Sequence, residues 1–199
     1  MKQEEKSQKS RERILRFAMA EFAAQGYRGA SINGICAAGS ISKGLLYHYY
    51  ADKDALYLAC GEKCFRELTG ALSEALSVET VTPDGYFNAR LDFFRQHPQH
   101  QRLFCDMVVN PPPHLSEEIS RCRASFDKLN EEMLTVILEK ETLAEGITIQ
   151  DAICQLRILE DCVSSYLKTA DQEQRQAEKH NQLCRQTFQT MLYGLIARK

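Results

Sequence analysis

Apolar residues recur every three or four positions through most of this chain, and the strict alternation typical of β-strands is nearly absent. This period predicts a helix over about 10–25, which Gly26 ends. Serine residues that can cap helix N-termini precede two short predicted helices, over about 31–38 and 42–49. An aspartate can cap the next helix, over about 52–76, where apolar side chains recur at every fourth position.

The same helical period continues through the rest of the printed sequence. It predicts a helix over about 83–97 and a second one that passes through 103–108. Three longer helices follow, over about 119–136, 149–169 and 173–197. No internal repeat is evident, so the predicted fold class is all-α with about nine helices.

The composition is that of an ordinary globular protein. The chain has 199 residues, of which 44% are hydrophobic and 26% are charged, and this is enough to bury a core without disulfides or metal. No run of 18 apolar residues is present, so no membrane span is predicted. The first ten residues are polar and charged, which differs from a secretory signal. We therefore expect a soluble, cytoplasmic protein with no membrane partner.

The net charge of −2 hides an asymmetry along the chain. Residues 1–60 contain nine Lys or Arg against six Asp or Glu, a balance of +3, and the remainder contains sixteen against twenty-one, a balance of −5. A basic N-terminal quarter on an acidic body suggests that this end binds a polyanion. A solvated, lysine-rich terminus is the alternative.

Eight cysteines raise the question of disulfides or of a metal site. They are scattered, they form no CxxC pair, and most lie within apolar helical patterns, where cysteine behaves as a small hydrophobic residue. We therefore expect reduced thiols, no metal and no other cofactor. Cys60 and Cys64 lie one helical turn apart and His97 and His100 form an HxxH pattern, so a metal site stays open as the alternative to plain packing.

Two short helices that are joined by a tight turn and supported by a first helix indicate a helix-turn-helix, whose second short helix enters the major groove of DNA. On the helix over 42–49, Leu46 and Tyr50 lie one turn apart and are expected to face the protein. A cation, a glycine and two aromatic residues fall on the opposite side: Lys43, Gly44, Tyr47 and His48. An ordinary helical hairpin with surface aromatic residues is the alternative.

The same region resembles the N-terminal DNA-binding domain of TetR-family transcriptional regulators. The resemblance covers about residues 10–59 without insertion, and the remainder matches only in length and helix count. The residues that carry it are Ile14-Leu15, Phe22, Gly26-Tyr27, Ser31-Ile32, Ile35, Ser42-Lys43-Gly44, Leu46-Tyr47-His48-Tyr49-Tyr50 and Asp52-Lys53-Asp54-Ala55-Leu56. The resemblance implies a helix-turn-helix domain over 1–52 and an effector-binding and dimerisation domain over 53–199.

The resemblance also implies roles for the residues at matching positions. Contacts to DNA phosphates fix the position of the protein, and contacts to base edges select the sequence. The residues assigned to phosphates are Ser31, Tyr47, Tyr49 and Lys53. The residues assigned to base edges are Lys43, Leu45 and His48, in a recognition helix that Ser42 begins and in which the backbone N–H of Gly44 can serve either purpose.

Two residues depart from the family's pattern. Ser40 stands where a turn glycine is common, with Gly39 one residue earlier, so the turn is expected to differ locally. Leu45 stands where a small polar residue is frequent, and it offers only apolar contact, for instance to a thymine methyl group. The operator sequence therefore stays open.

Members of this family form homodimers through their last two helices, and the pattern over 149–169 agrees with this. One stripe of that helix is apolar, and a second, roughly opposite stripe is built of smaller residues that suit close contact with another helix. A helix at the centre of a single protomer is the alternative. The residues predicted for the dimer interface are Cys154, Ile158, Cys162, Ser165, Phe188, Met191 and Leu195.

The family resemblance further implies an effector pocket among the middle helices. Few charged residues interrupt the apolar faces of these helices, so we expect an apolar or aromatic small molecule. The candidate lining residues are Tyr86, Phe87, Phe93, Phe94, Phe104, Met107, Phe126 and Met133. For each of them, a place in the ordinary core is the alternative.

Together these features predict a ligand-released homodimeric repressor that binds a palindromic double-stranded DNA operator. A repressor that responds to thiol oxidation or to a metal is the alternative that the eight cysteines keep open. A helical-bundle metalloenzyme is disfavoured because the paired Glu-x-x-His motifs that such a site needs are missing. We therefore expect no enzymatic activity and no catalytic residue.

Overall fold

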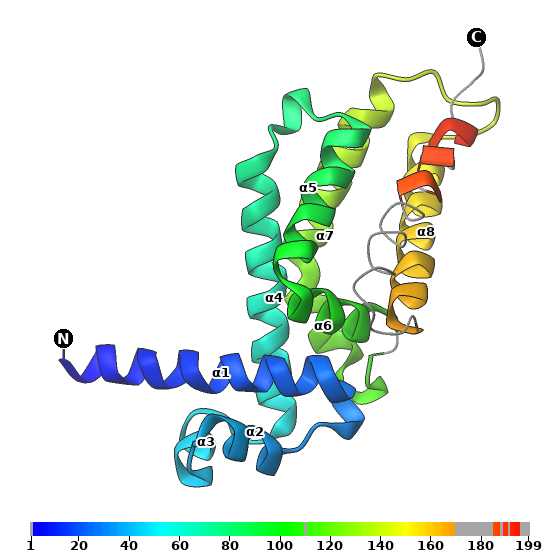
Figure 1. Ribbon diagram of the computed structural model, residues 1–199. Helices are drawn as coiled ribbons and strands as arrows, with labels where there is room; N and C mark the ends of the chain where they lie inside the picture. The colour runs from blue at the N-terminus through cyan, green and yellow to red at the C-terminus, as the bar shows by residue number, and fades with distance from the viewer. Residues whose placement is uncertain (1, 110, 170–184, 188, 191, 196–199) are drawn as a thin grey trace. The chain divides into compact units, whose positions relative to one another are not determined.

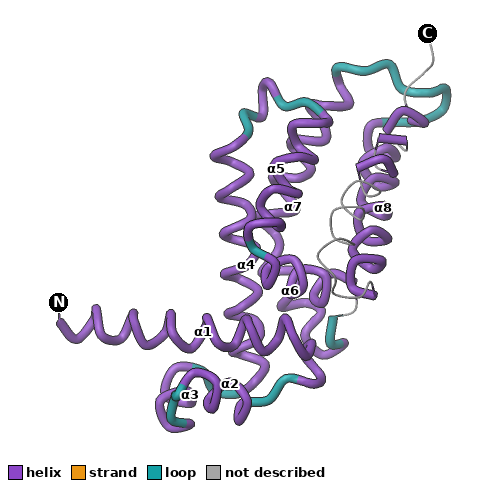
Figure 2. The backbone as a smooth tube through the Cα atoms, in the orientation of Figure 1, coloured by secondary structure: helices purple, strands orange, loops and turns teal. Residues whose placement is uncertain are grey.

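The structure is a computed structural model that describes residues 2–109, 111–169, 185–187, 189–190 and 192–195. Within these ranges the regular elements are helices and no β-strand is formed (Figure 1, Figure 2), so the predicted all-α class is confirmed. The described parts of the predicted last helix, from residue 185 onward, are helical, and its earlier part lies outside the described residues.

The helices follow the predicted order. They are α1 (Lys2–Gly29), α2 (Ile32–Gly39), α3 (Lys43–Tyr49), α4 (Lys53–Ala75), α5 (Pro83–Gln96), α6 (Pro98–Val109), α7 (Ser116–Glu139) and α8 (Ile149–Thr169). Two short 3-10 helices, η1 (Val78–Thr80) and η2 (Pro113–Leu115), lie in the connections before α5 and α7. None of the helices within the described ranges has both the length and the apolar content needed to cross a lipid bilayer.

Helix α1 begins at Lys2 rather than near the tenth residue. Its first residues favour a helix, because two acidic side chains in the first turn complement the helix dipole and Gln8 donates a hydrogen bond to Glu12 at 2.9 Å. Gly26 interrupts the helix at a φ of 65° and a ψ of 173°, as its predicted role as a stop requires, and the next three residues return to helical geometry.

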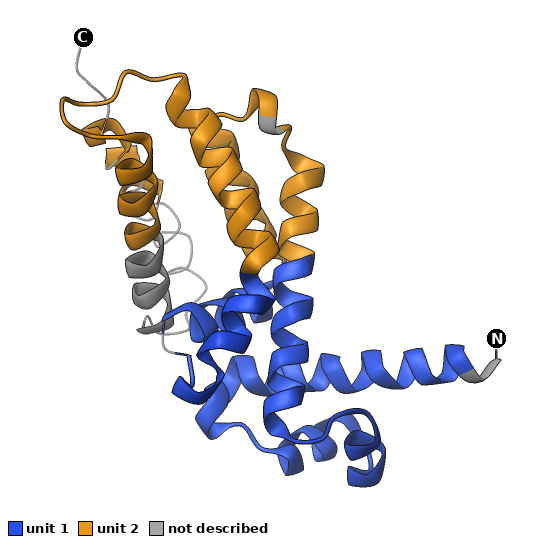
Figure 3. Ribbon diagram, turned by 180° about the vertical axis from the view of Figure 1, so that it is seen from behind, with its two compact units in different colours: residues 1–66, 97–123 blue, residues 67–96, 124–199 orange. Residues whose placement is uncertain are grey.

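The described chain divides into two compact units, one formed by residues 1–66 and 97–123 and the other by residues 67–96 and 124–199 (Figure 3). Helices α4 and α7 each contribute residues to both units. The functional division after residue 52 that the family resemblance implies falls inside the first unit, and it stays a proposal.

The first unit is built on aromatic and aliphatic side chains of α1, α3, α4 and α6. Phe22 of α1 meets the edge of Tyr57 of α4 with ring centroids 4.9 Å apart, and Phe65 of α4 meets Phe104 of α6 at 5.6 Å. Five positions of the predicted every-fourth-residue pattern of α4 are fully buried in this unit or in the next: Leu56, Cys60, Cys64, Leu68 and Leu72. The sixth, Leu76, follows the end of α4 and is half-buried. Burial of these apolar side chains stabilises the helix.

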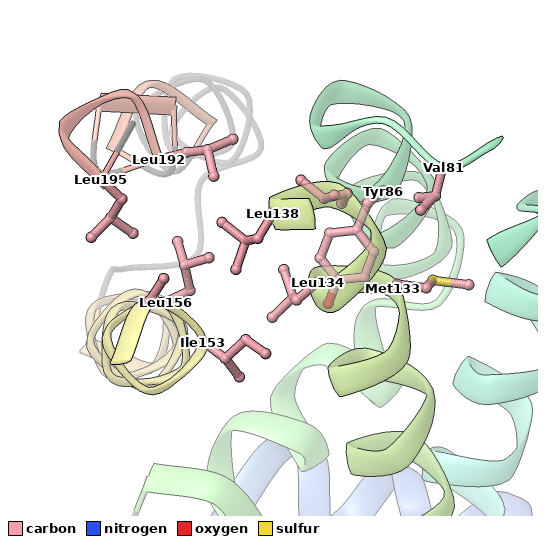
Figure 4. Packing of buried hydrophobic residues seen from close by; sticks show 11 residues of the cluster. Val81, Tyr86, Met133, Leu134, Leu138, Ile153, Leu156, Leu192 and Leu195 are labelled. Atoms are coloured by element: carbon pink, nitrogen blue, oxygen red, sulfur yellow. The ribbon is translucent and has the colours of Figure 1, made fainter. Parts of the chain in front are cut away.

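The second unit has its own core, which Figure 4 shows from close by. Side chains of α5, α7, α8 and the C-terminal helical residues meet in it, among them Tyr86, Leu134, Leu156 and Leu192. The core also holds a polar group, because the Tyr86 hydroxyl donates to Oδ1 of the buried Asn130. A buried amide that finds such a partner avoids the desolvation penalty of an unpaired group.

Candidate nucleic-acid interface

Helices α2 and α3 lie side by side next to α1 at the surface of the first unit (Figure 1, Figure 3). Ser31 caps α2: its Oγ accepts a hydrogen bond from the backbone N–H of Gly34 at 2.9 Å. The backbone N–H of Ser31 donates in turn to the Glu21 carboxylate at 3.2 Å. The predicted start of the second helix at Ser31 is thus confirmed, and the exposed hydroxyl still has a proton to donate.

In the turn between α2 and α3, a serine occupies a backbone conformation that favours glycine. Ser40 adopts the left-handed conformation, with φ 48° and ψ 49°. Close packing excludes a side chain at Gly39, because a Cβ there would lie 2.5 Å from Cδ1 of Ile41 and 2.8 Å from Cδ2 of Phe17. Arg13 of α1 donates to the Gly39 carbonyl at 2.7 Å and holds the turn against the first helix.

The left-handed Ser40 gives a direct prediction. We expect Ser40→Gly to raise the free energy of unfolding by about 0.5–1 kcal/mol. The left-handed conformation costs a non-glycine residue roughly 1–2 kcal/mol, and glycine relieves this strain. Part of the gain is lost because glycine also makes the unfolded chain more flexible. Urea denaturation measures the change. The control is Ala38→Gly at the neighbouring exposed helical position, which should lower stability by about 1 kcal/mol. Equal destabilisation by both changes would contradict this assignment of the turn.

Helix α3 shows the two faces that the sequence predicts. The Ser42 hydroxyl caps it by accepting from the backbone N–H of Leu45 at 3.2 Å, and Leu46 is completely buried. Tyr50 is half-buried at the helix end. The opposite face is exposed to solvent and consists of Lys43, Gly44, Leu45, Tyr47 and His48.

Two residues on this exposed face are not explained by packing within the protein. Tyr47 leaves 49% of its surface exposed, which is unusual for a large aromatic residue. A Cβ added at Gly44 would meet no other atom within 4 Å, so the fold does not require a glycine there. The face therefore offers aromatic, cationic and apolar groups around a position where a backbone can approach closely.

Tyr49 is half-buried at the end of α3 and contacts α1. Its hydroxyl donates to Oγ of Ser7 at 3.1 Å, and the Arg11 guanidinium lies 5.3 Å from the centre of its ring. Ser7 was not predicted as a partner of Tyr49, because α1 was expected to start after it. The helical character of the first ten residues was the available signal, since Glu, Lys and Gln are good helix formers.

Lys53 stands in the first turn of α4, which Asp52 caps by accepting from the backbone N–H of Ala55 at 2.8 Å. Its ammonium lies 4.5 Å from the centre of the Tyr27 ring. The Tyr27 hydroxyl donates to Oδ1 of Asp54, and Nε2 of His114 lies 3.0 Å from Oδ2 of the same carboxylate. Partial burial and the Asp54 carboxylate raise the pKa of Tyr27 to about 12, so this phenol stays neutral at physiological pH.

A buried carboxylate holds this region to α6. Oδ2 of Asp106 accepts from the Tyr57 hydroxyl at 2.8 Å and from the backbone N–H of Tyr27 at 3.1 Å. Burial, followed by the charge of Asp106, raises the pKa of Tyr57 far above its usual range, so its hydroxyl remains a donor. The roles of Asp106, Tyr57 and His114 were not predicted, because a single side chain carries no local signal of a partner that is distant in the chain.

The residues predicted for an effector pocket are divided between the two units. Phe104 and Met107 are buried in the first unit, and the other six belong to the second. In the second unit Tyr86 and Met133 are part of the core cluster, and Phe87 is half-buried against it. The Arg90 guanidinium lies over the Phe126 ring, 5.3 Å from its centre. The pocket itself stays a prediction.

The residues predicted for a dimer interface differ in how far they are exposed to solvent. Cys154 and Ile158 are exposed on α8, with 57% of Ile158 open to solvent, and Ala152 and Leu156 on the other side are buried. Leu195 is only 3% exposed and packs in the core of its own unit, which leaves little of its surface for a second protomer. Helical spacing alone does not tell which apolar stripe faces inward. The remaining candidates lie outside the residues whose side chains are described: Cys162, Ser165, Phe188 and Met191.

The cysteine pair of α4 is a packing feature. Cys60 and Cys64 are completely buried, and burial raises the pKa of the Cys60 thiol well above its usual range, with Cys64 adding to the effect. A buried thiol that stays protonated is a poor nucleophile and a poor metal ligand. Among the residues that the structure describes, no three His, Cys, Asp or Glu side chains are grouped as metal ligands would be.

Comparison with known proteins agrees with this geometry. Residues 14–60 match the model of the bacterial regulatory proteins of the tetR family. The HTH-type transcriptional repressor SCO4008 of Streptomyces coelicolor is 38% identical over 94 residues, which are 46% of this chain and 45% of the repressor. The chain spans about half the length of the curated relatives it matches. Their names are those of transcriptional regulators and repressors, which agrees with the expectation that the chain is not an enzyme.

Solved structures share the fold over most of the chain. A TetR-like transcriptional regulator from Rhodococcus sp. RHA1 has a TM-score of 0.65 at 19% identity, over 93% of this chain and 96% of that one. The regulator FadR of Bacillus subtilis, in complex with stearoyl-CoA, has a TM-score of 0.68 at 13% identity, over 92% and 98%. Such identities show the fold alone. Within this shared fold, residues 14–60, which match the tetR family model, form the later part of α1, the helices α2 and α3, and the start of α4.

Proposed function

We propose that the chain is a DNA-binding transcriptional regulator, which represses as a homodimer at a palindromic operator and is released from DNA by a small molecule. The observation that carries the DNA-binding part is the exposed face of α3. That helix is short, capped by Ser42 and anchored by the buried Leu46, so its outer face is presented rigidly. A rigid helix with exposed polar and aromatic groups fits the major groove.

The contacts divide into two kinds. Lys43, Leu45 and His48 contact base edges, because they project from the exposed face of the helix that enters the groove. The residues proposed to contact phosphates are Ser31, Tyr47, Tyr49 and Lys53, whose side chains carry hydroxyl or ammonium groups. Tyr49 does so by exchanging its hydrogen bond to Ser7 for one to a phosphate. Ser42 and the backbone N–H of Gly44 lie at the start of α3, between these two groups.

The homodimer is proposed on the exposed stripe of α8. An isoleucine that leaves more than half of its surface in water, one turn from Cys154, fits a helix face that a second protomer covers. Two protomers place two recognition helices at two half-sites, and a single helix-turn-helix contacts too few base pairs for specificity. Two-fold symmetry then makes the operator palindromic.

The effector is proposed to be an apolar or aromatic small molecule that binds in the domain over 53–199. The aromatic content of α5 supports this, as does the FadR neighbour that was solved with stearoyl-CoA. Helix α4 carries Lys53 in its first turn and continues into the second unit at Leu68 and Leu72. One continuous helix therefore contains both a proposed DNA contact and part of the proposed effector-binding domain. The relatives' roles as transcriptional regulators support a cytoplasmic location.

Selection of bound sequences from random double-stranded DNA tests this function. The full chain should enrich an inverted repeat whose half-site centres lie about 34–36 Å apart along the duplex, or a multiple of this spacing. Failure to enrich any sequence at low salt would contradict DNA reading by this chain. Enrichment of a single site without inverted symmetry would contradict the dimer and leave the recognition helix in place.

A further inference from the structure

Tyr27 and Lys53 form a contact that the proposed DNA contacts do not by themselves explain. Tyr27 follows the break in α1, and Lys53 stands in the first turn of α4. The lysine ammonium lies 4.5 Å from the centre of the tyrosine ring. At this distance the negative face of the ring attracts the cation.

The Tyr27 ring is fixed from several directions. Asp106 of α6 accepts a hydrogen bond from its backbone N–H, and Tyr57 of α4 meets the ring edge-on with centroids 5.0 Å apart. The hydroxyl donates to Asp54, next to Lys53 in the chain. His114 of η2 completes the arrangement, with Nε2 at 3.3 Å from the Tyr27 oxygen. The ring therefore cannot turn without breaking contacts to two other helices.

The left-handed Gly26 makes this position possible. With a φ of 65°, the chain changes direction between the long part of α1 and its last turn, which is where Tyr27 lies. A residue other than glycine is strained in this conformation. The backbone thus places the ring beside the start of α4.

We propose that Tyr27 is a positioning residue for DNA binding, whose ring holds the Lys53 ammonium in place for a backbone phosphate. The inference rests on the proposed function, and it assigns a role to a residue that need not touch DNA. A lysine side chain has four flexible methylene groups, and ordering it upon binding costs conformational entropy. A lysine that already rests on a fixed ring has less entropy to lose, and its three N–H donors remain available to an anion.

Binding measurements on four full-length proteins test the inference: the parent, Tyr27→Leu, Lys53→Ala and the double variant. The probe is a duplex selected from random DNA, titrated at several salt concentrations. Tyr27→Leu should weaken binding about two- to fivefold per protomer, or roughly 4–25-fold for a dimer, with the salt dependence unchanged. Lys53→Ala should flatten the salt dependence by about one phosphate contact per protomer. In the double variant, the loss should not exceed that of Lys53→Ala.

A control variant, and a second pair of variants at position 27, separate positioning from general destabilisation. Tyr57→Phe keeps its ring and removes the hydrogen bond to Asp106, so it disturbs the same region without touching the contact between Tyr27 and Lys53. It should leave DNA affinity within about twofold of the parent once folding is verified by thermal denaturation. If Tyr27→Leu does not fold, phenylalanine and its trifluorinated analogue at position 27 replace it, since fluorine weakens the ring's attraction for a cation at nearly constant shape.

The outcomes are distinct. A fall in affinity from phenylalanine to trifluorophenylalanine that disappears in the Lys53→Ala background supports the inference. Two results overturn the inference while the proposed function stands. One is DNA binding by Tyr27→Leu that is as tight as that of the parent or tighter. The other is a fall in affinity on Tyr27→Leu that is just as large in the Lys53→Ala background. Absence of DNA binding by the parent at low salt contradicts the proposed function, and this inference with it.

Discussion

Replacing Lys43 and Tyr47 together by alanine is expected to lower operator affinity by at least about 100-fold. Both side chains lie on the exposed face of α3. In a dimer both protomers carry the two changes, so four side-chain contacts are removed. A lost phosphate or base contact is worth about 1–3 kcal/mol, so even the lower value gives a loss of this size. Neither side chain contributes to the core, and the thermal stability of the variant should therefore stay close to that of the parent.

Fluorescence anisotropy with a labelled operator measures this loss. Lys128→Ala is the matched control, because it removes the same charge from an exposed lysine of α7, where 79% of the side chain is open to solvent. The control should bind within about twofold of the parent, since the charge of a single exposed lysine outside the proposed DNA contacts is largely screened by salt. Comparable affinities for the double variant and the control would show that α3 does not read DNA.

The second large effect is expected for Ile158→Glu, which should convert the dimer to monomers at micromolar concentration. A carboxylate at the centre of an apolar helix contact loses its hydration without gaining a partner, a cost of several kcal/mol in each protomer. Ile158 is exposed in the single chain, so the change should not harm the fold of the protomer. Because specific binding needs both recognition helices, operator affinity should fall as well.

Sedimentation velocity decides this point. Gln99→Glu adds the same charge at an exposed position of α6 and should leave the dimer intact. Leu195→Glu is expected to behave differently, because Leu195 belongs to the core of its own unit and its replacement should unfold that unit. A parent chain that sediments as a monomer, or an Ile158→Glu variant that remains a dimer, would contradict the proposed interface.

The helices themselves could be predicted well from sequence, because period and caps are local signals. The start of α3 follows from Ser42, and the long helix α8 has the bounds that its apolar pattern indicates. The early start of α1 was missed, because a polar helix without an apolar stripe has no hydrophobic period to detect. Capping and pattern therefore define an element best where one of its faces is buried.

The site was predictable in part. The exposed face of α3 follows from the burial of Leu46, since residues on the opposite side of a short helix must face solvent. The contact of Tyr27 with Lys53 and the hydrogen bond from Tyr57 to Asp106 could not be predicted, because they join residues that are distant in the chain. Such contacts depend on how helices pack, and one sequence holds no local signal of that packing.

The most direct test of the central claim is photo-crosslinking from α3 to DNA. A photoreactive phenylalanine analogue at position 47 is incorporated into the full chain, which is then irradiated on a selected operator duplex. The same analogue at position 128 of α7 serves as the comparison, since both positions are exposed. Crosslinks are expected from position 47 within each half-site, and none from position 128. Binding of the operator without crosslinks from position 47, or with equal crosslinks from both positions, would contradict the central claim.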